Sequence, residues 1–285
     1  MSGSILDVGG IRITSLSDGN VVFDPRLMFP DTPLEHWSQF YDIFPECFSG
    51  QHFLMNLGVF VMGSAGKNVI ADTGFGPHGK MLGSDTSAEL MDDFARKGIR
   101  TEDIDTVFMS HLHADHVGWN IDPDTADVPV FPNARYTVHR DDWEHFTVPD
   151  EDSEFGMEPI ERSVIPLQQI GALDLMEGET ELATGITAIP TPGHTPGHMA
   201  LLLSSGKERA IFIGDILINP MQGTDTDLPF ALDTDPAEAL DTRLKVLDQA
   251  EAEGTIVLGS HLSPPGWGTI VRWEGRRYWR GFATS

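Results

Sequence analysis

The stretch SHLHADH, residues 110–116, directly follows an apolar segment, Thr106–Met109, that is typical of a β-strand. It brings three histidines and one aspartate into six consecutive positions: His111, His113, Asp115 and His116. Neutral imidazole nitrogens and carboxylate oxygens are ligands that first-row metals accept, and a loop at a strand end can point alternate side chains at one centre. This density therefore predicts a metal site.

Three more ligand-type residues follow apolar strands in the second half of the chain. They are His194 in the motif TPGH, Asp215 in the motif IGD and His261 in the motif GSH. Any one of them alone would more often be a capping or core residue. Together with the first cluster they supply seven ligands, which is enough for two metal ions with open positions for water.

The segments around these motifs alternate between strand and helix patterns. Strands are predicted where β-branched and apolar residues are bounded by Gly, Asp or Asn: Ile11–Leu16, Phe53–Met62, Asn68–Ala71, Thr106–Met109, Arg135–Val138, Ile186–Ile189, Ala200–Leu203, Ala210–Ile213 and Thr255–Leu258. Helices are predicted at Thr86–Lys97, which stops at Gly98, and at Ala237–Glu251, which follows Asp235 and Pro236. Two similar halves predict an α+β sandwich with two sheets inside and helices outside, although no sequence repeat is visible.

Two stretches carry no regular pattern and are predicted to be long surface loops, Phe23–Ser49 and Val148–Pro159. The first holds more apolar mass than a solvated loop needs, with Trp37 and Phe48 among its aromatic residues. One interpretation is an apolar wall that covers a pocket, and ordinary packing onto the body of the protein explains the same residues equally well.

Composition narrows the class of protein. The chain has 285 residues, of which 40% are hydrophobic, so it has material for one large core or two small ones. Its formal charge of −26 disfavours nucleic acid and anionic membrane surfaces as partners. No apolar run of membrane-spanning length and no secretory start are present, which makes a cytoplasmic protein the expectation. The single cysteine, Cys47, excludes an internal disulfide and is expected to be a small buried hydrophobe.

The HxHxDH stretch, followed in order by His194, Asp215 and His261, resembles the metallo-β-lactamase superfamily over essentially the whole chain. This resemblance implies an αββα four-layer sandwich, formed as a single domain over residues 1–285. It also implies two divalent metal ions per chain, with zinc expected and manganese, cobalt or iron as alternatives. The implied ligands are His111, His113 and His194 for the first ion, Asp115, His116 and His261 for the second, and Asp215 as the bridge between them.

Other polar residues receive supporting roles or none. Asp72, in the motif DTG, matches a turn that in the superfamily supports the metal site from outside the ligands, and stabilisation of the turn itself is compatible with this. His198 follows His194 by four residues and is expected to be structural. The remaining histidines lack supporting context: His36, His52, His78, His139 and His145.

Within the superfamily, residues 191–198, 230–236 and 259–266 look most like the methyl parathion hydrolase and quorum-quenching lactonase group. The implied substrates are small apolar esters, lactones or phosphotriesters, and a homodimer is the expected assembly. Phe230 is a candidate for the pocket wall, and Trp119 adds bulk that narrows the pocket. Acyl-homoserine lactonases carry a tyrosine shortly after the bridging aspartate, whereas this chain has isoleucine, leucine and isoleucine after Asp215.

The expected mechanism is attack by a hydroxide that both metals share, with Asp115 and Asp215 as the catalytic carboxylates. Two alternatives stay open. A persulfide dioxygenase needs only one iron held by two histidines and one aspartate. A thioester hydrolase of the glyoxalase II type needs a helical C-terminal domain, for which few residues follow His261.

Overall fold

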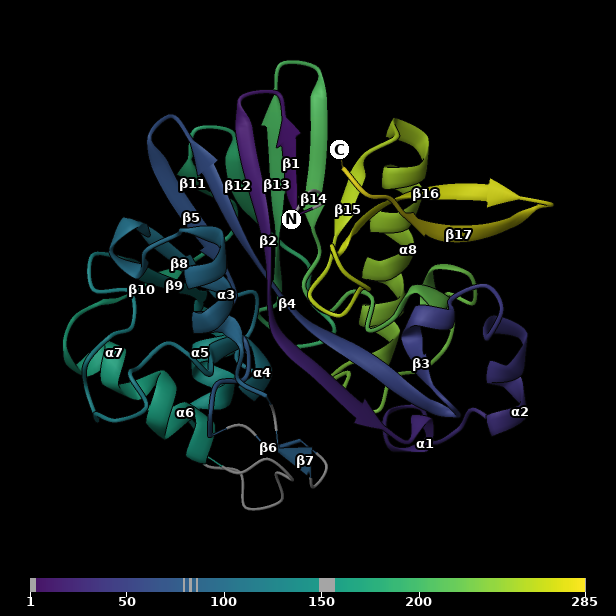
Figure 1. Ribbon diagram of the computed structural model, residues 1–285, viewed down its shortest axis with the longest axis horizontal. Coiled ribbons are helices and arrows are strands. Elements are labelled where there is room, and N and C mark those ends of the chain that lie inside the picture. The colour runs from purple at the N-terminus through teal and green to yellow at the C-terminus, as the bar shows by residue number, and fades with distance from the viewer. Residues whose placement is uncertain (1–3, 79, 82–83, 86, 149–156, 285) are drawn as a thin grey trace.

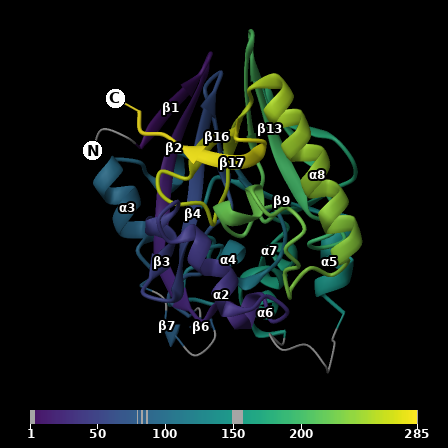
Figure 2. The same ribbon diagram turned by 90° about the vertical axis from the view of Figure 1, so that its right-hand side faces the viewer.

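Two β-sheets lie face to face with helices on their outer sides in the computed structural model, which describes residues 4–78, 80–81, 84–85, 87–148 and 157–284. Figure 2 shows helices α3 (Leu90–Lys97) and α8 (Pro236–Glu253) on opposite sides of the two sheets. The α+β sandwich predicted from the sequence is confirmed. Within the described ranges, no helix combines the length and the apolarity needed to cross a bilayer.

The first sheet is built from the N-terminal half of the chain. Its strands, in spatial order, are β1 (Ile5–Val8), β2 (Ile11–Phe23), β4 (His52–Ser64), β5 (Lys67–Ala71), β8 (Thr106–Phe108), β9 (Arg135–His139) and β10 (Leu173–Met176), with the short β3 (Phe48–Ser49) paired to β4. The first four run antiparallel, whereas β5, β8, β9 and β10 are parallel. A separate short hairpin joins β6 (Lys80–Met81) and β7 (Ser84–Asp85).

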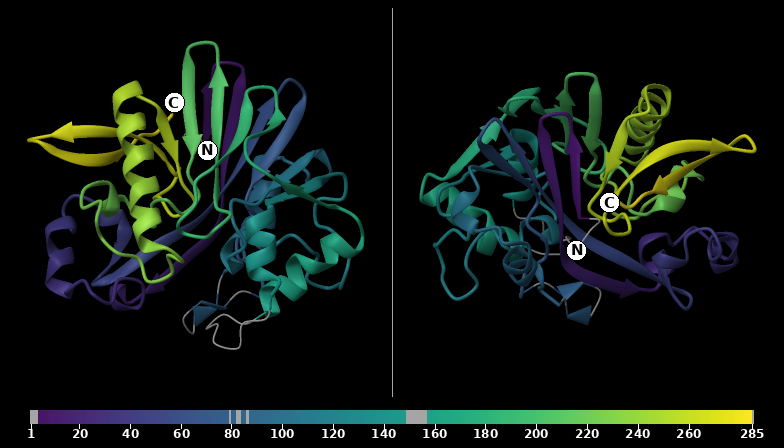
Figure 3. Two further views of the ribbon diagram at one scale, coloured as in Figure 1. Left: turned by 180° about the vertical axis from the view of Figure 1, so that it is seen from behind. Right: turned by 45° about the horizontal axis from the view of Figure 1, so that its top comes forward.

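The second sheet follows chain order. Its strands are β11 (Thr180–Ala183), β12 (Ile186–Pro190), β13 (Met199–Ser205), β14 (Glu208–Phe212), β15 (Ile256–Leu258), β16 (Trp267–Trp273) and β17 (Arg276–Gly281). Only β14 and β15 pair in parallel, and α8 is the crossover between them. Figure 3 shows α8 lying along this sheet and the β16–β17 hairpin extending away from it.

Apolar residues fill three layers of packing. The layer between the sheets contains Ile13, Phe60 and Phe108 from the first sheet and Leu201 and Phe212 from the second, all without exposed surface. Burial of side chains of this size contributes about 1.5–3 kcal/mol each relative to exposure. The outer face of the first sheet is covered by α3, α6 (Glu158–Ser163) and α7 (Ile165–Gln169), and the outer face of the second by α8.

All the predicted strands and both predicted helices are present, with shifted ends. The first helix begins at Leu90, while the predicted start at Thr86 lies outside the described residues. It ends at Gly98, whose φ of 67° is the left-handed conformation expected of a helix-terminating glycine. The second helix starts after Asp235, whose carboxylate accepts hydrogen bonds from the backbone N–H groups of Ala237 and Glu238, both at 3.0 Å.

The loop predicted over Phe23–Ser49 is wrong as a description of that segment. The chain there forms α1 (Pro25–Met28), α2 (Leu34–Trp37), two 3₁₀ turns (Ser38–Phe40 and Pro45–Cys47) and β3. Its aromatic rings pack on one another and on Phe53 of β4, which explains the apolar mass that a solvated loop would not need. In the other predicted loop, Val148–Pro159, residues 149–156 lie outside the described residues, and α6 begins at Glu158.

Asp18 fixes an irregular position in β2, where the register with β4 shifts between Ser17 and Asn20. Its buried carboxylate accepts four hydrogen bonds: from the backbone N–H groups of Phe75 and Gly76 at 2.8 Å, from that of Leu90 at 2.9 Å, and from the indole of Trp119 at 2.9 Å. Burial raises the pKa of this carboxyl group. Asp18 thus ties the turn after β5 and the start of α3 to the first sheet.

Asp18→Asn is expected to lower the free energy of unfolding by about 2–4 kcal/mol. Each carboxylate oxygen accepts two hydrogen bonds, so an amide necessarily turns its NH₂ group toward two donors. Urea denaturation followed by circular dichroism measures the loss. The control is Asp7→Asn, which removes an exposed pairing with Arg12 and should cost less than about 1 kcal/mol. Equal stabilities of the two variants would contradict this account of Asp18.

Candidate metal centre

The seven ligand-type side chains meet at one end of the sandwich because they follow the carboxyl ends of its central strands. His111, His113, Asp115 and His116 come after β8, the last two within the one-turn helix α4 (Ala114–Val117). His194 follows β12, Asp215 follows β14 and His261 follows β15. Parallel neighbours end at the same edge of a sheet, and the edges of the two sheets face each other here.

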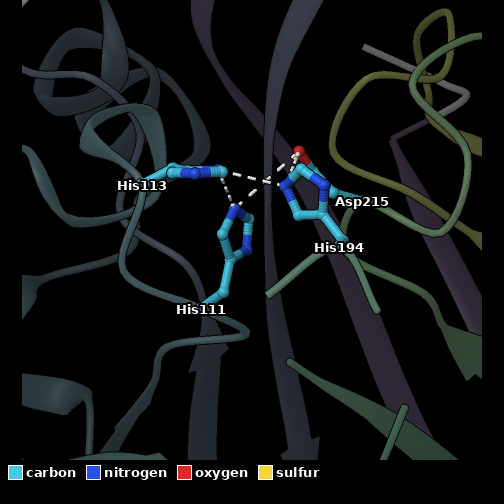
Figure 4. Close-up of side chains that lie close together, drawn as sticks. All are labelled: His111, His113, His194 and Asp215. Carbon is cyan, nitrogen blue, oxygen red and sulfur yellow. Dashed lines mark hydrogen bonds and ion pairs between the residues drawn. The ribbon is translucent and has the colours of Figure 1, made fainter. Parts of the chain in front are cut away.

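His111, His113 and His194 point their ring nitrogens at one centre (Figure 4). His113 Nδ1 lies 3.0 Å from His111 Nε2 and 3.0 Å from His194 Nε2. Tetrahedral zinc with bonds of about 2.0–2.1 Å to nitrogen places its ligand atoms about 3.3 Å apart. The three nitrogens therefore have the spacing that a small divalent cation requires.

Asp115, His116 and His261 form a second group whose ligand atoms also lie within 4.8 Å of one another. His261 Nε2 is 3.4 Å from Asp115 Oδ2, and His116 Nε2 is 3.7 Å from the same oxygen. All three residues are buried. A second cation fits between them.

Asp215 stands between the two groups and offers one oxygen to each. Its Oδ2 lies 3.4 Å from His194 Nε2 and 3.8 Å from His111 Nε2. Its Oδ1 lies 3.3 Å from His116 Nε2 and 3.2 Å from His261 Nε2. A carboxylate placed in this way could bridge two cations, the role that the resemblance implies for this residue.

Buried polar atoms without a good hydrogen bond support the presence of a cation. In the described part of the chain, His116 Nε2 and Asp215 Oδ1 are buried and lie 3.3 Å apart, but neither makes a hydrogen bond of good geometry. Leaving such a group unsatisfied costs about 1–3 kcal/mol. Because both atoms face the same small volume, one divalent ion would satisfy both.

The protonation states also fit a metal site. Burial, with the neighbouring imidazoles, holds the pKa of His111 and His113 well below its usual range, so both rings stay neutral, which is the form in which an imidazole binds a metal. Burial opposes charge on His116 as well, but the carboxylates around it outweigh burial and raise the pKa of this ring well above its usual range. A proton there compensates the carboxylates when no cation is bound, and a metal ion would displace it.

Asp72 orients two of the ligands from behind. Its carboxylate accepts hydrogen bonds from the backbone N–H of Ser110 at 2.7 Å and from the Ser110 hydroxyl at 2.9 Å, and it lies 2.8 Å from His116 Nδ1. The Ser110 hydroxyl also lies 3.0 Å from His111 Nδ1. Asp72 itself has a φ of 59°, a left-handed conformation that is costly for a residue other than glycine. The motif DTG thus orients ligands as well as forming a turn.

Two hydrogen-bond partners of the ligand histidines were not predicted from the sequence. Asp233 Oδ1 lies 2.9 Å from His194 Nδ1, and the backbone oxygen of Asn56 lies 2.9 Å from His261 Nδ1. Such contacts fix the ring tautomer, which leaves Nε2 of each ring for a metal. A carboxylate within the resembling segment 230–236 was the available signal for Asp233, whereas nothing in the sequence marks a backbone oxygen in β4.

His198 uses both of its nitrogens in hydrogen bonds that shape the site. Its Nδ1 lies 2.9 Å from the Thr191 hydroxyl, and its Nε2 accepts a hydrogen bond from the backbone N–H of Asp215 at 3.1 Å. Burial lowers the pKa of this ring to about 3, so it stays neutral. Gly214, which precedes Asp215, has a φ of 48°, and a Cβ there would lie 2.6 Å from His198 Nε2. These contacts suit a positioning residue and leave no ring nitrogen for a metal.

Asp142, in α5 (Arg140–Phe146), ties the two ligand loops together. Its carboxylate accepts hydrogen bonds from the backbone N–H of Leu112 at 3.2 Å, from the Thr195 hydroxyl at 3.0 Å and from the backbone N–H of Gly197 at 2.7 Å. Burial raises the pKa of this carboxyl group to about 6. One buried side chain thereby sets the spacing between the loop that carries His111 and the loop that carries His194.

A cavity of about 610 Å³ opens over these ligands. Its floor includes His113, Asp115, Asp215 and His261. Its wall combines apolar and polar side chains, and the apolar ones are Met28, Met55, Phe75, Leu112, Phe146, Ile160, Ile218, Phe230 and Leu232. Polar side chains reach it from His78, His145, Glu158, Arg162 and Ser163, so two histidines given no role from the sequence lie on this wall.

The structure places the four residues predicted for the pocket wall differently from one another. Phe230 lines the cavity, whereas Trp37, Phe48 and Trp119 are not among its lining residues, so that part of the wall needs correction. Trp37 is completely buried behind it, with its ring 5.2 Å from Phe29. Phe48 packs on Tyr41, and the Trp119 indole donates to Asp18. These three rings are therefore part of the interior packing. Met28 is the residue of the segment 23–49 that lines the cavity.

Comparison with known proteins points in one direction. The family model described as metallo-beta-lactamase superfamily matches residues 58–261. An N-acyl homoserine lactonase from a Bacillus species is 28% identical over 151 residues, which is 53% of this chain and 53% of that protein, so the match spans about half the length of the relative.

Two solved structures share the fold along the whole chain. The dizinc quorum-quenching lactonase AidC, in complex with a product, superposes with a TM-score of 0.87 at 20% identity and covers 100% of this chain and 98% of its own. The hydrolase AbOPH superposes with a TM-score of 0.86 at 24% identity, again with 100% and 98% coverage.

Purified protein saturated with zinc is expected to retain two ions per chain, and Asp215→Asn should retain one or fewer. Asparagine keeps the size of aspartate but removes the charge that holds two cations at bridging distance. Elemental analysis after gel filtration measures the stoichiometry. Asp174→Asn, an exposed aspartate paired with Arg135, is the matched control and should retain two ions. Two tightly held ions in Asp215→Asn would overturn the bridging assignment.

Proposed function

Because this chain belongs to the metallo-beta-lactamase superfamily, we propose that it is a dinuclear metal-dependent hydrolase that cleaves ester bonds in small lactones and related apolar esters. The observation that carries the proposal is that the two carboxylate oxygens of Asp215 face different groups of ligands. Oδ2 faces His194, and Oδ1 faces His116 and His261. A carboxylate shared in this way would hold two ions close enough to act on one water molecule.

Two divalent ions, with zinc as the expected metal, would acidify a shared water so that it attacks near neutral pH, and would polarise the oxygen of the bond to be cleaved. The side chains divide the remaining work. Asp72 and Asp233 keep His116 and His194 in the tautomer that binds a cation. Asp115 lies both in the second ligand group and on the cavity surface, where its carboxylate can accept the proton that the attacking water releases and pass it to the leaving alkoxide.

The cavity supports an apolar substrate. Its wall gathers methionine, phenylalanine, leucine and isoleucine side chains above a charged floor, an arrangement that binds a hydrocarbon or aryl group and leaves one polar bond at the metals. The related lactonase and the AidC structure, whose product is a homoserine, favour a lactone as that polar part. Phosphotriesters stay within the proposal through the resemblance of residues 230–236 to methyl parathion hydrolase.

The wall position nearest in sequence to the bridging aspartate is apolar. Ile218 lines the cavity, and the three tyrosines of the chain, Tyr41, Tyr136 and Tyr278, are absent from the lining residues. Among the described lining residues no phenol is present to assist the developing oxyanion, and metal ions bound at the floor would stabilise that charge. Substrates with acidic leaving groups, such as aryl esters, are accordingly expected to react faster than alkyl esters of the same size.

The oxidative alternative requires fewer ligand residues than the chain brings together at this site. A mononuclear iron centre needs two histidines and one aspartate, yet two complete groups of ligand atoms are buried here and share Asp215. After His261 the chain forms the strands β16 and β17.

A hydrolysis screen with controlled metal content tests the proposal. It compares p-nitrophenyl esters, γ- and δ-lactones, N-acyl homoserine lactones and phosphotriesters. The expected result is turnover of at least one ester or lactone class that falls about a hundredfold or more in a chelator and returns with zinc. Full occupancy by one iron, with oxygen uptake on glutathione persulfide and no hydrolysis, would establish the oxidative alternative instead.

Phe230→Ala is expected to raise KM for apolar substrates by about tenfold to a hundredfold, since a buried phenylalanine contributes about 1.5–3 kcal/mol of apolar contact. Metal content should stay at two ions because Phe230 is not a ligand. Steady-state kinetics with elemental analysis measure both. Trp37→Phe is the matched control, because Trp37 lies behind the wall and its indole N–H has no hydrogen-bond partner among the described residues. A larger increase in KM in Trp37→Phe than in Phe230→Ala would show that Trp37 of the segment 23–49, and not Phe230, contacts the substrate.

A further inference from the structure

Arg243 in α8 is a buried cation, with only 2% of its surface exposed. Its guanidinium donates to three backbone carbonyls of one segment: Nε to Ile216 at 2.9 Å, and Nη1 to Thr226 at 2.9 Å and Leu228 at 3.3 Å. Its Nη2 lies 3.6 Å from Asp233 Oδ2. Arg243 therefore holds the segment 216–233 at both of its ends and in the middle.

The same segment forms part of the cavity wall. It contributes Ile218, Phe230 and Leu232 to the lining. Gln222 closes it from within, because its side-chain oxygen accepts from the backbone N–H of Ile218 at 2.8 Å and its amide donates to the Leu228 carbonyl at 3.3 Å. The shape of this wall thus depends on a few buried hydrogen bonds, several of them from Arg243.

Asp233 connects that wall to a metal ligand. One oxygen faces Arg243 and the other lies 2.9 Å from His194 Nδ1, with 3% of each side chain exposed in the Arg243–Asp233 and His194–Asp233 pairs. The His194 loop also rests on α8: the Thr242 hydroxyl donates to the Pro192 carbonyl at 2.6 Å, and a Cβ on Gly193 would lie 2.2 Å from the backbone nitrogen of Ala239. Neighbouring residues of one helix therefore hold the substrate wall and the metal ligand.

We propose that Arg243 is a positioning residue that couples the substrate wall 216–233 to the metal site through Asp233 and His194. The inference deepens the proposed function and rests on it. A displaced wall moves Asp233, and Asp233 fixes the ring of His194. By reciprocity, an ion on His194 favours the arrangement of Asp233 and Arg243 that shapes the wall.

Packing alone does not account for a guanidinium at this position. Burial works against its charge and lowers the pKa of Arg243. Replacement of a whole buried ion pair by apolar residues is often neutral or stabilising, so packing of α8 alone does not require a charge at this position, whereas the three carbonyls and Asp233 require a donor. A fork with five N–H donors is, however, the side chain that can serve several carbonyls and a carboxylate at once.

The test measures zinc affinity, by competition with a chromophoric chelator, and then KM and kcat at saturating zinc. The variants are Arg243→Met, Asp233→Asn and the double variant, with Arg243→Lys in case the methionine variant does not fold. Arg277→Met is the matched control, because Arg277 pairs with Asp248 and Glu251 of the same helix away from the cavity.

The expected result is a loss of affinity for one of the two zinc ions, about tenfold in Arg243→Met or Arg243→Lys and about tenfold to a hundredfold in Asp233→Asn. The double variant should lose less than the product of the single losses, since both residues act through His194. At saturating zinc, KM should remain raised in the Arg243 variants, while Arg277→Met keeps wild-type zinc affinity and KM.

Wild-type zinc affinity in folded Arg243→Met or Arg243→Lys, or strictly multiplicative losses in the double variant, would overturn the coupling and leave Arg243 a structural residue. The zinc measurement uses no substrate. A wild-type chain that binds two ions but hydrolyses none of the tested esters would therefore count against the proposed function and leave the coupling standing on its affinity data.

Discussion

The constraint on which the rest of the structure depends is the burial of several carboxylates away from water. Three carboxylates, Asp72, Asp115 and Asp215, are buried beside five imidazoles at the end of the sandwich. Several kcal/mol would be lost for each uncompensated charge in such a place, so the site demands cations or protons. The raised pKa of His116, produced by the carboxylates against the effect of burial, is the mark of that demand. A pair of divalent ions answers it fully, because each ion offsets more negative charge than one proton does.

The fold meets this constraint by fixing loops rather than by adding mass. Strand pairs β5–β8 and β14–β15 end at the same edge, and each loop that leaves them is tied to another by a buried polar side chain. Asp142 joins the loops that carry His111 and His194, Asp72 joins the turn after β5 to the loop after β8, and His198 fixes the backbone of Asp215. Each tie crosses between segments that are distant in sequence. Removal of a tie is therefore expected to loosen ligand geometry before it unfolds a sheet.

The strands and the ligand-type residues could be predicted from the sequence, because each of these features leaves a local pattern. Alternating apolar residues mark a strand, and His111 to His116 are dense enough to stand out. The ties left no such pattern: Asp142, Asp233 and Arg243 are single polar residues whose partners lie far along the chain. The segment 23–49 misled for a related reason. Its apolar content was evident, but whether Trp37 faced a cavity or Phe29 and Phe53 depended on tertiary packing that composition does not encode.

The division between floor and wall explains how one metal site can serve different substrates. Among the floor residues, His261 is fixed by the backbone oxygen of Asn56 in β4, whereas Ile218, Phe230 and Leu232 belong to a segment whose backbone accepts buried hydrogen bonds from Arg243 and Gln222 and donates one to Gln222. Substitution within that segment changes what fits in the cavity without replacing a ligand, although Phe230 packs on His194, with the two ring centroids 5.7 Å apart. It does not leave the ligands independent, however, because Asp233 closes the segment on His194. Under the proposed coupling, a change in the wall that moves Asp233 away from the imidazole would also weaken metal binding, so the wall and the ligands constrain each other.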